Sequence, residues 1–485
     1  MRKFSAVMMC ILLFGSLLAA CGGKEKAADN TKNEGNKATN NASAGGNTST
    51  DAAAPEDIAD KKITLKIHYP LPDETTLKAT EDDKIARFQK KYPNVTIVKD
   101  DWRYSVDEIG VKMASNEAPT FYNTWATEAS LLIERGWVAD ITDLWNNWEY
   151  KDEINPVIQQ QFIRDGKVYG VTQNGYITST VVNKKLLADK GVEAPSLDWT
   201  WDDMLNTAKA SADAKKGISG IAPMGKGNES GWNWTNFLFE AGGEIQSNEN
   251  GKVTAVFNSE AGVKALDFYK KLRWEAEAIP QDWALGWSDA VGSFQQGRTA
   301  MVIAGAFDVI NAALNEGGMK PEDVVAYPMP AAEKGGKHYG ILGGNYLVIN
   351  PNSTKDEQEM AFRYITFDYF SDDALKAVED TIAARKADNK YYIPNPMEYF
   401  SWDSEYGKKV EAIQAKYDNV YKYDPQLFTL LEGKIEAQYN TQDYYATMSN
   451  VVQESFSKKG TDSKTQLDVA AKYVQETFFD KVAQK

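Results

Sequence analysis

Short apolar stretches alternate with longer stretches of helical spacing through most of the chain. Residues 63–67 alternate between apolar and polar side chains as a strand does, and residues 95–98 have the same character. Between them, apolar residues at positions 85–92 fall at helical spacing, and Pro93 ends that helix. A strand, a helix and a second strand in this order form a βαβ unit, which predicts a parallel sheet.

The same signals continue towards the C-terminus. Thr200–Asp203 and Thr354–Glu357 have the capping-box arrangement that begins a helix. Apolar residues between 261 and 272 lie on one face of another helix, and residues 300–304 and 347–349 form two short apolar strands. We therefore expect an α/β protein, and a chain of 485 residues is long enough for two cores.

The N-terminus carries a signal for secretion. A basic start precedes an apolar run over residues 4–20, which is too short and too abruptly ended for a stable membrane span. The sequence Leu18-Ala19-Ala20-Cys21 resembles the bacterial lipobox, in which the cysteine is acylated and becomes the mature N-terminus. We predict a lipoprotein signal peptide over residues 1–20 and a membrane anchor on Cys21. The alternative is a plain cleaved signal with a chance cysteine.

The segment after Cys21 has the composition of a flexible tether. Residues 22–57 contain no aromatic residue and no Val, Ile, Leu or Met. We therefore assign residues 21–57 to the lipidated cysteine and its tether. No later segment approaches eighteen uninterrupted apolar residues, so the sequence predicts no second membrane crossing.

The negative net charge and the small number of histidines and cysteines exclude several functions. The chain has a net charge of −15, and removal of residues 1–20 takes away two basic residues and leaves −17. A nucleic-acid groove needs the opposite sign. Two histidines and two cysteines leave almost nothing for a metal site, haem or Cys/His catalysis, and the familiar nucleotide and hydrolase motifs are missing. We expect no cofactor, no metal and no catalytic residues.

Five motifs in a fixed order resemble one protein family. They are Leu131–Thr142, Asp165–Val171 (DGKVYGV), Val182–Leu186, Trp199–Met204 (WTWDDM) and Phe294–Met301 (FQQGRTAM). Together they are similar to the extracellular solute-binding proteins of bacterial ABC importers, specifically the carbohydrate-binding group (family 1) of lipoprotein type. FQQGRTAM is the most specific of the five.

The resemblance implies a periplasmic-binding-protein-like class II fold, with two α/β lobes, a hinge and a ligand cleft between them. We expect the first lobe in residues 58–173 and 341–380, and the second in residues 174–340 and 381–485. The resemblance also implies a monomer on the extracellular face of the bacterial cytoplasmic membrane. Such a receptor captures a sugar, which we expect to be an oligosaccharide, and delivers it to the permease subunits of an ABC transporter.

A sugar cleft needs flat aromatic rings for the C–H faces of the sugar, and amides or carboxylates for its hydroxyls. The chain has thirteen tryptophans. Those in amphipathic or motif segments are assigned to packing, namely Trp137, Trp145, Trp148, Trp199, Trp201 and Trp274. Those in segments interpreted as loops are candidates for stacking on a ligand, namely Trp102, Trp125, Trp232, Trp234, Trp283 and Trp287.

Polar clusters complete the candidate site. Residues 173–176 and 343–346 are expected to form two hinge crossings, and the Phe307-Asp308 pair follows a turn where the family often has an aromatic residue. The further ligand-binding candidates are Tyr69, Asp101, Asn174, Tyr176, Phe307, Asp308, Asn345, Tyr346 and Arg385. Alternatively, Asp101 and Asp308 cap turns, and Arg385 is an ordinary surface residue.

Other functions stay open at this point. An extracellular glycan-degrading enzyme needs only two carboxylates about 5–10 Å apart, although no catalytic signature surrounds any of the acids. Within the same fold the ligand could be a peptide or a quaternary amine, because tryptophan cages also hold cations. A surface adhesin would lack the hinge. The negative charge favours neutral or cationic ligands.

Overall fold

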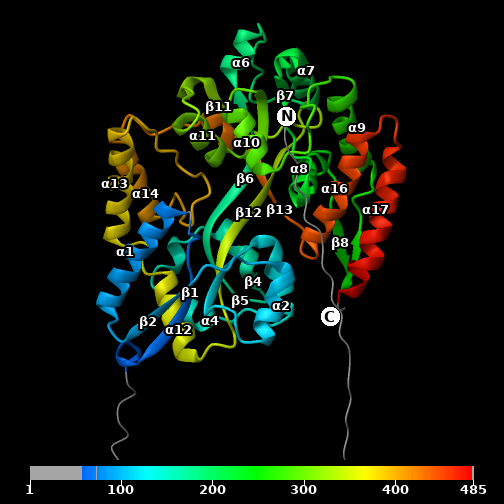
Figure 1. Cartoon of the computed structure of the whole chain (residues 1–485). Helices are drawn as coiled ribbons and strands as arrows, with labels where there is room; N and C mark the ends of the chain where they lie inside the picture. The colour runs from blue at the N-terminus through cyan, green and yellow to red at the C-terminus, as the bar shows by residue number, and fades with distance from the viewer. Residues whose placement is uncertain (1–56, 73, 483–485) are drawn as a thin grey trace, which may run out of the picture. The chain divides into compact units, whose positions relative to one another are not determined.

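The computed structural model describes residues 57–72 and 74–482 (Figure 1). These residues belong to one compact unit, Glu56–Lys485. The predicted signal peptide, the lipidation site Cys21 and nearly all of the predicted tether lie outside the described residues. Among the described residues, no helix has the length and apolar character needed to cross a membrane.

The centre of the unit is a mixed sheet of nine strands. Seven follow the order β2-β1-β3-β12-β6-β10-β7, while β11 pairs with β6 and β13 with β12. The strands are β1 (Ile63–His68), β2 (Val95–Asp100), β3 (Phe121–Trp125), β6 (Val171–Asn183), β7 (Ser219–Ile221), β10 (Thr299–Gly305), β11 (Val324–Tyr327), β12 (His338–Ile349) and β13 (Leu431–Ile435). Two short hairpins add β4 (Ile163–Arg164) with β5 (Lys167–Val168), and β8 (Gln246–Glu249) with β9 (Lys252–Ala255).

Helices surround the sheet. They are α1 (Thr75–Lys91), α2 (Val106–Ala114), α3 (Ala129–Glu134), α4 (Thr142–Asn146), α5 (Pro156–Gln159), α6 (Lys184–Asp189), α7 (Trp201–Ser211), α8 (Gly227–Glu240), α9 (Glu260–Trp274), α10 (Trp287–Gln295), α11 (Ala306–Asn315), α12 (Lys355–Ile365), α13 (Asp372–Ala387), α14 (Glu405–Gln414), α15 (Pro425–Leu430), α16 (Thr441–Ser457) and α17 (Ser463–Thr477). A short 3-10 helix, η2 (Ala126–Glu128), follows β3 directly.

The local predictions are confirmed. Strands β1 and β2 are parallel, and α1 connects them as the βαβ pattern requires. The predicted capping boxes at Thr200 and Thr354 begin α7 and α12. The predicted strand at residues 300–304 is β10, and residues 347–349 are the end of β12.

Two long strands connect the two lobes. One end of β12 pairs with β3, and its other end pairs with β13. Strand β6 pairs with β12 through Val171–Ile177 and then with β10 and β11 through Thr178–Asn183. In Figure 1 these strands run from the part with α4 and α12 to the part with α6 and α11. We call the part built on β1, β2 and β3 the first lobe, and the part built on β7, β10 and β11 the second lobe.

Each lobe has its own apolar core. The first lobe buries residues of β1 and α12 together, including Leu65 and Ile365. The second lobe buries aromatic residues from α7, α8, α9 and α16. The segment assigned by sequence to the second lobe contributes Phe400 and Tyr406 to the first-lobe core, and Ile393 to a core of the second lobe. Apart from these contacts, the proposed lobe boundaries stay a prediction.

Candidate ligand-binding cleft

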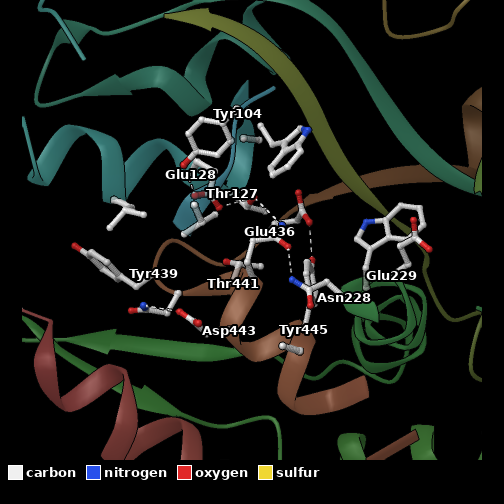
Figure 2. A pocket seen from close by; sticks show the side chains of 18 of the residues that line it. Tyr104, Thr127, Glu128, Asn228, Glu229, Glu436, Tyr439, Thr441, Asp443 and Tyr445 are labelled. Atoms are coloured by element: carbon white, nitrogen blue, oxygen red, sulfur yellow. Dashed lines mark hydrogen bonds between the residues drawn. The ribbon is translucent and has the colours of Figure 1, made fainter. Parts of the chain in front are cut away.

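A large cleft opens between the two lobes at the hinge strands (Figure 2). Its volume is about 1610 Å³. Its first-lobe wall comes from η2 and the end of β3, and its second-lobe wall from α8, α10, α11 and α16. Tyr176 and Asn345 line it from the hinge strands β6 and β12.

Aromatic rings line the first-lobe wall. Trp125 ends β3 and is 42% exposed, which is unusual for so large an apolar side chain. The ring of Tyr104 contacts the Trp125 ring at a centroid distance of 5.5 Å and an angle of 90°. Tyr104 in turn stacks on buried Tyr122 at 6.0 Å and 2°. These contacts fix the position of Trp125 while part of its ring stays open to the cleft.

A second group of aromatic residues lies on the second lobe and the hinge. The rings of Trp232 and Tyr176 meet edge to face at 6.0 Å. Tyr176 fits there because Gly343 faces it across the sheet, where an added Cβ would lie 2.3 Å from the Tyr176 hydroxyl oxygen. Trp287 begins α10, and its backbone N–H donates to Glu229 Oε2 at 2.6 Å. The cleft therefore has aromatic walls on both sides.

Two buried carboxylates face the cleft (Figure 2). Glu128 is 3% exposed and accepts a hydrogen bond of 2.7 Å from the Tyr104 hydroxyl. Glu436 is 8% exposed and accepts one of 2.6 Å from the Tyr445 hydroxyl. Burial raises the pKa of Glu128, and burial together with the charge of Glu128 raises the pKa of Glu436 to about 7. The Tyr445 hydrogen bond opposes that rise.

A polar chain joins the two lobes at the rim of the cleft. The side-chain amide of Gln442 donates to Thr127 Oγ1 at 3.0 Å, and that of Asn228 donates to Gln442 Oε1 at 2.9 Å. Thr127 belongs to the first lobe, whereas Gln442 on α16 and Asn228 on α8 belong to the second. The Gln442–Thr127 hydrogen bond therefore links the two lobes.

Comparison with known proteins identifies the family. The model of the bacterial extracellular solute-binding protein family matches residues 72–369. The chain belongs to this family. No curated protein matches this solute-binding protein closely enough to count as a relative.

Solved structures share the fold. One is an ABC transporter solute-binding protein from Thermotoga lettingae bound with α-D-tagatose, with a TM-score of 0.64 and 21% identity over 85% of this chain and 99% of that one. Another, from Listeria monocytogenes with cycloalternan, has a TM-score of 0.64 and 17% identity over 86% and 99%. The acarbose-binding receptor of Streptomyces glaucescens gives 0.62 and 18% over 87% and 100%. The class II fold with two α/β lobes is thereby confirmed, and the family and these structures are binding proteins.

Six of the fifteen sequence-predicted ligand residues line the cleft. They are Trp125, Tyr176, Trp232, Trp287, Asp308 and Asn345. The sequence predicts loops around Trp232 and Trp287, whereas the structure places Trp232 on α8 and Trp287 at the start of α10. Burial of Asp308 on α11 raises the pKa of its carboxyl group.

Three predicted residues pack in or against the apolar cores of the solute-binding protein. Trp234 and Tyr346 are fully buried, so neither side chain can contact a ligand in this conformation. The Tyr346 hydroxyl donates to the backbone oxygen of Ile158 at 2.7 Å. Trp283 packs edge to face on buried Phe456 at 5.6 Å. Apolar packing accounts for all three, and we remove them from the candidate site.

The structure also places three first-lobe candidates outside the cleft lining. The hydroxyl of buried Tyr69 donates to Asp82 Oδ1 at 2.9 Å. The indole N–H of Trp102 donates to Glu108 Oε2 at 2.7 Å, and Asp101 beside it is exposed.

The last three candidates have structural partners of their own. Asn174 on β6 accepts a hydrogen bond of 2.8 Å from the Asn345 amide and so supports a cleft residue. Phe307 packs against the second-lobe core. Arg385 donates to Asn311 Oδ1 and to the Tyr391 backbone oxygen, both at 2.9 Å. None of the three is part of the cleft lining.

Sequence reasoning missed the carboxylates and their tyrosines. Glu128 follows the candidate Trp125 by three residues, so a search around that tryptophan could have found it. Glu436 and Tyr445 lie in the C-terminal part, where the family resemblance is weakest, and no local pattern marks them. Their place in the cleft depends on the pairing of β13 with β12.

Replacement of Glu436 should change how stability depends on pH. Between pH 4.5 and about 7 the native state holds a proton on Glu436 that the unfolded chain has released, so stability falls as the pH rises through this range. Glu436→Gln should therefore be more stable than the wild type at pH 8, by about 1–3 kcal/mol. At pH 4 the two proteins should have similar stability. Urea unfolding at both pH values tests this, and a difference independent of pH would contradict it.

Proposed function

We propose that the protein is the lipid-anchored receptor of an ABC importer, which captures an oligosaccharide in the interlobe cleft and delivers it to the permease. The observation that supports this most directly is the cleft itself, which has aromatic residues on both walls and a volume of about 1610 Å³. Sites for small ligands usually occupy about 300–1,000 Å³. The larger volume favours a ligand of several sugar units.

The side chains of the cleft suit the two kinds of surface that a sugar presents. The Trp125, Trp232 and Trp287 rings offer apolar faces for C–H groups. Asn228, Asn345 and the carboxylates offer partners for hydroxyls. Solved structures of the same fold contain sugars, including tagatose, cycloalternan and maltose, which supports a carbohydrate here.

A screen of ligands by thermal shift tests the proposal. The purified protein is heated with sugars, peptides and quaternary amines, and any glycan that shifts the melting temperature is recovered and analysed. A ligand at about a hundred times its dissociation constant adds roughly 2.7 kcal/mol to stability. A shift with one glycan class, with the glycan recovered intact, would support a receptor. Shortened glycan would instead indicate an enzyme, and shifts only with peptides or amines would overturn the sugar.

Trp125→Ala should weaken glycan binding by about 1–3 kcal/mol, because the exposed ring is expected to stack on a sugar face. The melting temperature should hardly change, because 42% of the side chain is exposed and its removal leaves little cavity. Calorimetric titration with the glycan found in the screen measures the effect. Trp137→Ala is the matched control, since Trp137 lies outside the cleft lining. Equal affinities for Trp125→Ala and the wild type would remove this residue from the site.

The anchor is the second part of the proposal. Cys21 at the end of the lipobox-like sequence would carry the acyl chains, and the polar segment after it would let the receptor move above the membrane. Cys21→Ser should abolish incorporation of labelled fatty acid and release most of the protein into the medium. The wild type should fractionate with the membrane. A cleaved but unlabelled wild-type protein would show that the sequence is a plain secretion signal.

A further inference from the structure

The two buried carboxylates of the cleft have no cationic partner among the described residues. Neither Glu128 nor Glu436 takes part in an ion pair there, although both are more than nine-tenths buried. A buried carboxylate without a positive partner is costly, and proteins normally pair such groups or leave them protonated.

The carboxylates approach the cleft from opposite lobes. Glu128 ends η2 on the first lobe, and Glu436 follows β13, which pairs with the second-lobe end of β12. Figure 2 shows both side chains in the same region of the cleft. They are close enough for the charge of Glu128 to act on Glu436. A group bound between them would contact both lobes.

Each carboxylate is held in place with acceptor capacity left over. The Tyr445 hydroxyl occupies Glu436 Oε1, and Oε2 receives no hydrogen bond from the described residues. Glu436 lines the cleft, and its Oε2 atom is not fully enclosed by protein atoms. The Tyr104 hydroxyl donates to Glu128 Oε2 at 2.7 Å, and the Thr127 hydroxyl donates more weakly to Glu128 Oε1 at 3.4 Å. Glu436 Oε2 is therefore open to a donor from the ligand, and the Glu128 oxygens keep further lone pairs that can accept.

The cleft as a whole has more acidic than basic residues. Seven acidic and three basic residues line it, namely Asp107, Glu128, Glu134, Glu229, Asp308, Glu436 and Asp443 against Arg135, Lys226 and Lys481. Lys226 is already paired with Asp289 at 2.7 Å. An anionic sugar would therefore meet repulsion here, whereas a positive group would be attracted to the carboxylates.

We propose that the glycan carries a primary amine, bound as its ammonium between Glu128 and Glu436. A primary ammonium has three N–H donors and no acceptor, which matches two carboxylates that only accept. A quaternary amine has no N–H donor and would leave Glu436 Oε2 unpaired. The substrate class is thus an oligosaccharide that contains hexosamine units with free amino groups. This inference rests on the proposed function, because it specifies the ligand of the same cleft.

The test compares tetrasaccharides that differ only at C2. The probes are β-1,4-linked tetramers of glucosamine, N-acetylglucosamine and glucose, titrated into the purified protein at pH 7 by calorimetry. The glucosamine tetramer should bind at least tenfold more tightly than either of the other two. Glu436→Gln and Glu128→Gln should each weaken glucosamine binding at least tenfold and change binding of a neutral glycan much less.

A buried carboxylate elsewhere provides the matched control. Glu240 is 6% exposed and accepts a hydrogen bond of 2.8 Å from the Trp201 indole, but it lies outside the cleft lining. Glu240→Gln should leave the affinity for the glucosamine tetramer unchanged. Melting curves of all variants establish that they fold, and glutamine keeps an oxygen to which Tyr445 or Tyr104 can donate.

The outcomes separate the inference from the proposed function. Equal or tighter binding of the neutral or acetylated tetramer would overturn the amine and keep the sugar receptor. The same holds if only neutral glycans of other linkages shift the melting temperature in the wider screen. If no glycan in that screen shifts the melting temperature, both the proposed function and the inference are overturned.

Discussion

Gly231→Ala should destabilise the second lobe by about 3 kcal/mol or more, because helices α8 and α16 meet at this glycine. A Cβ added at Gly231 would lie 2.2 Å from the backbone oxygen of Tyr445. The opposing atom belongs to a helical backbone and cannot rotate away. The Gly231 N–H donates to Ser449 Oγ on α16 at 3.2 Å, so this hydrogen bond also depends on the close approach of the two helices.

The same contact positions the second-lobe wall of the cleft. Gly231 adjoins Trp232 on α8, and Tyr445 on α16 holds Glu436. Separation of the two helices should therefore weaken ligand binding as well as stability. Alanine is the smallest residue that can replace glycine, so every substitution at Gly231 should have this effect.

Gly292→Ala supplies the control for this prediction. Gly292 is also a helical glycine, on α10, but an added Cβ there would meet no atom within 4 Å. Alanine favours the helix by about 0.5–1 kcal/mol relative to glycine, so Gly292→Ala should be neutral or slightly stabilising. Urea unfolding curves of the two variants give the comparison. Similar stability of both variants would mean that α8 and α16 are not in close contact.

Trp199→Ala should lower the free energy of unfolding by about 3–5 kcal/mol. The Trp199 side chain is fully buried, and its indole N–H donates to the Pro328 backbone oxygen at 2.9 Å. Its ring also contacts the Tyr327 ring at a centroid distance of 5.4 Å. Alanine would leave a cavity and a buried carbonyl oxygen without its donor.

Two comparisons make the Trp199 prediction specific. Trp199→Phe keeps most of the volume and loses the hydrogen bond, so it should cost clearly less than Trp199→Ala. Trp125→Ala removes the same side chain from an exposed position and should cost almost nothing. Thermal and urea unfolding of the three variants test the order. A loss below about 1 kcal/mol for Trp199→Ala would contradict the assignment of Trp199 to the core.

The local sequence determined the secondary structure because its signals act over a few residues. The capping boxes at Thr200 and Thr354 satisfy free N–H groups of their own helices, so neighbouring residues suffice to predict them. The alternation in β1 and the proline after α1 act over similarly short distances. The order of the five family motifs then predicted the fold, because each motif corresponds to one element of the same architecture.

Which aromatic residues face the cleft depended on the elements that carry them. Trp232 and Trp234 lie two residues apart on α8, and a helix turns by about 200° over two residues. Trp232 therefore reaches the cleft while Trp234 is buried in the core. Asn345 and Tyr346 are adjacent on β12, where successive side chains point to opposite faces. The sequence prediction included both members of each pair as ligand residues, but only one member of each pair can face the cleft.

The sequence by itself determined the α/β class, the family resemblance and six residues of the cleft lining. Only the tertiary structure decided the carboxylate pair, because Glu128 and Glu436 are far apart in the sequence and meet across two lobes. No short pattern marks such residues, since their partners Tyr104 and Tyr445 come from different elements. Long-range strand pairing brings them to one cleft, and burial there gives them properties that neither has in the unfolded chain.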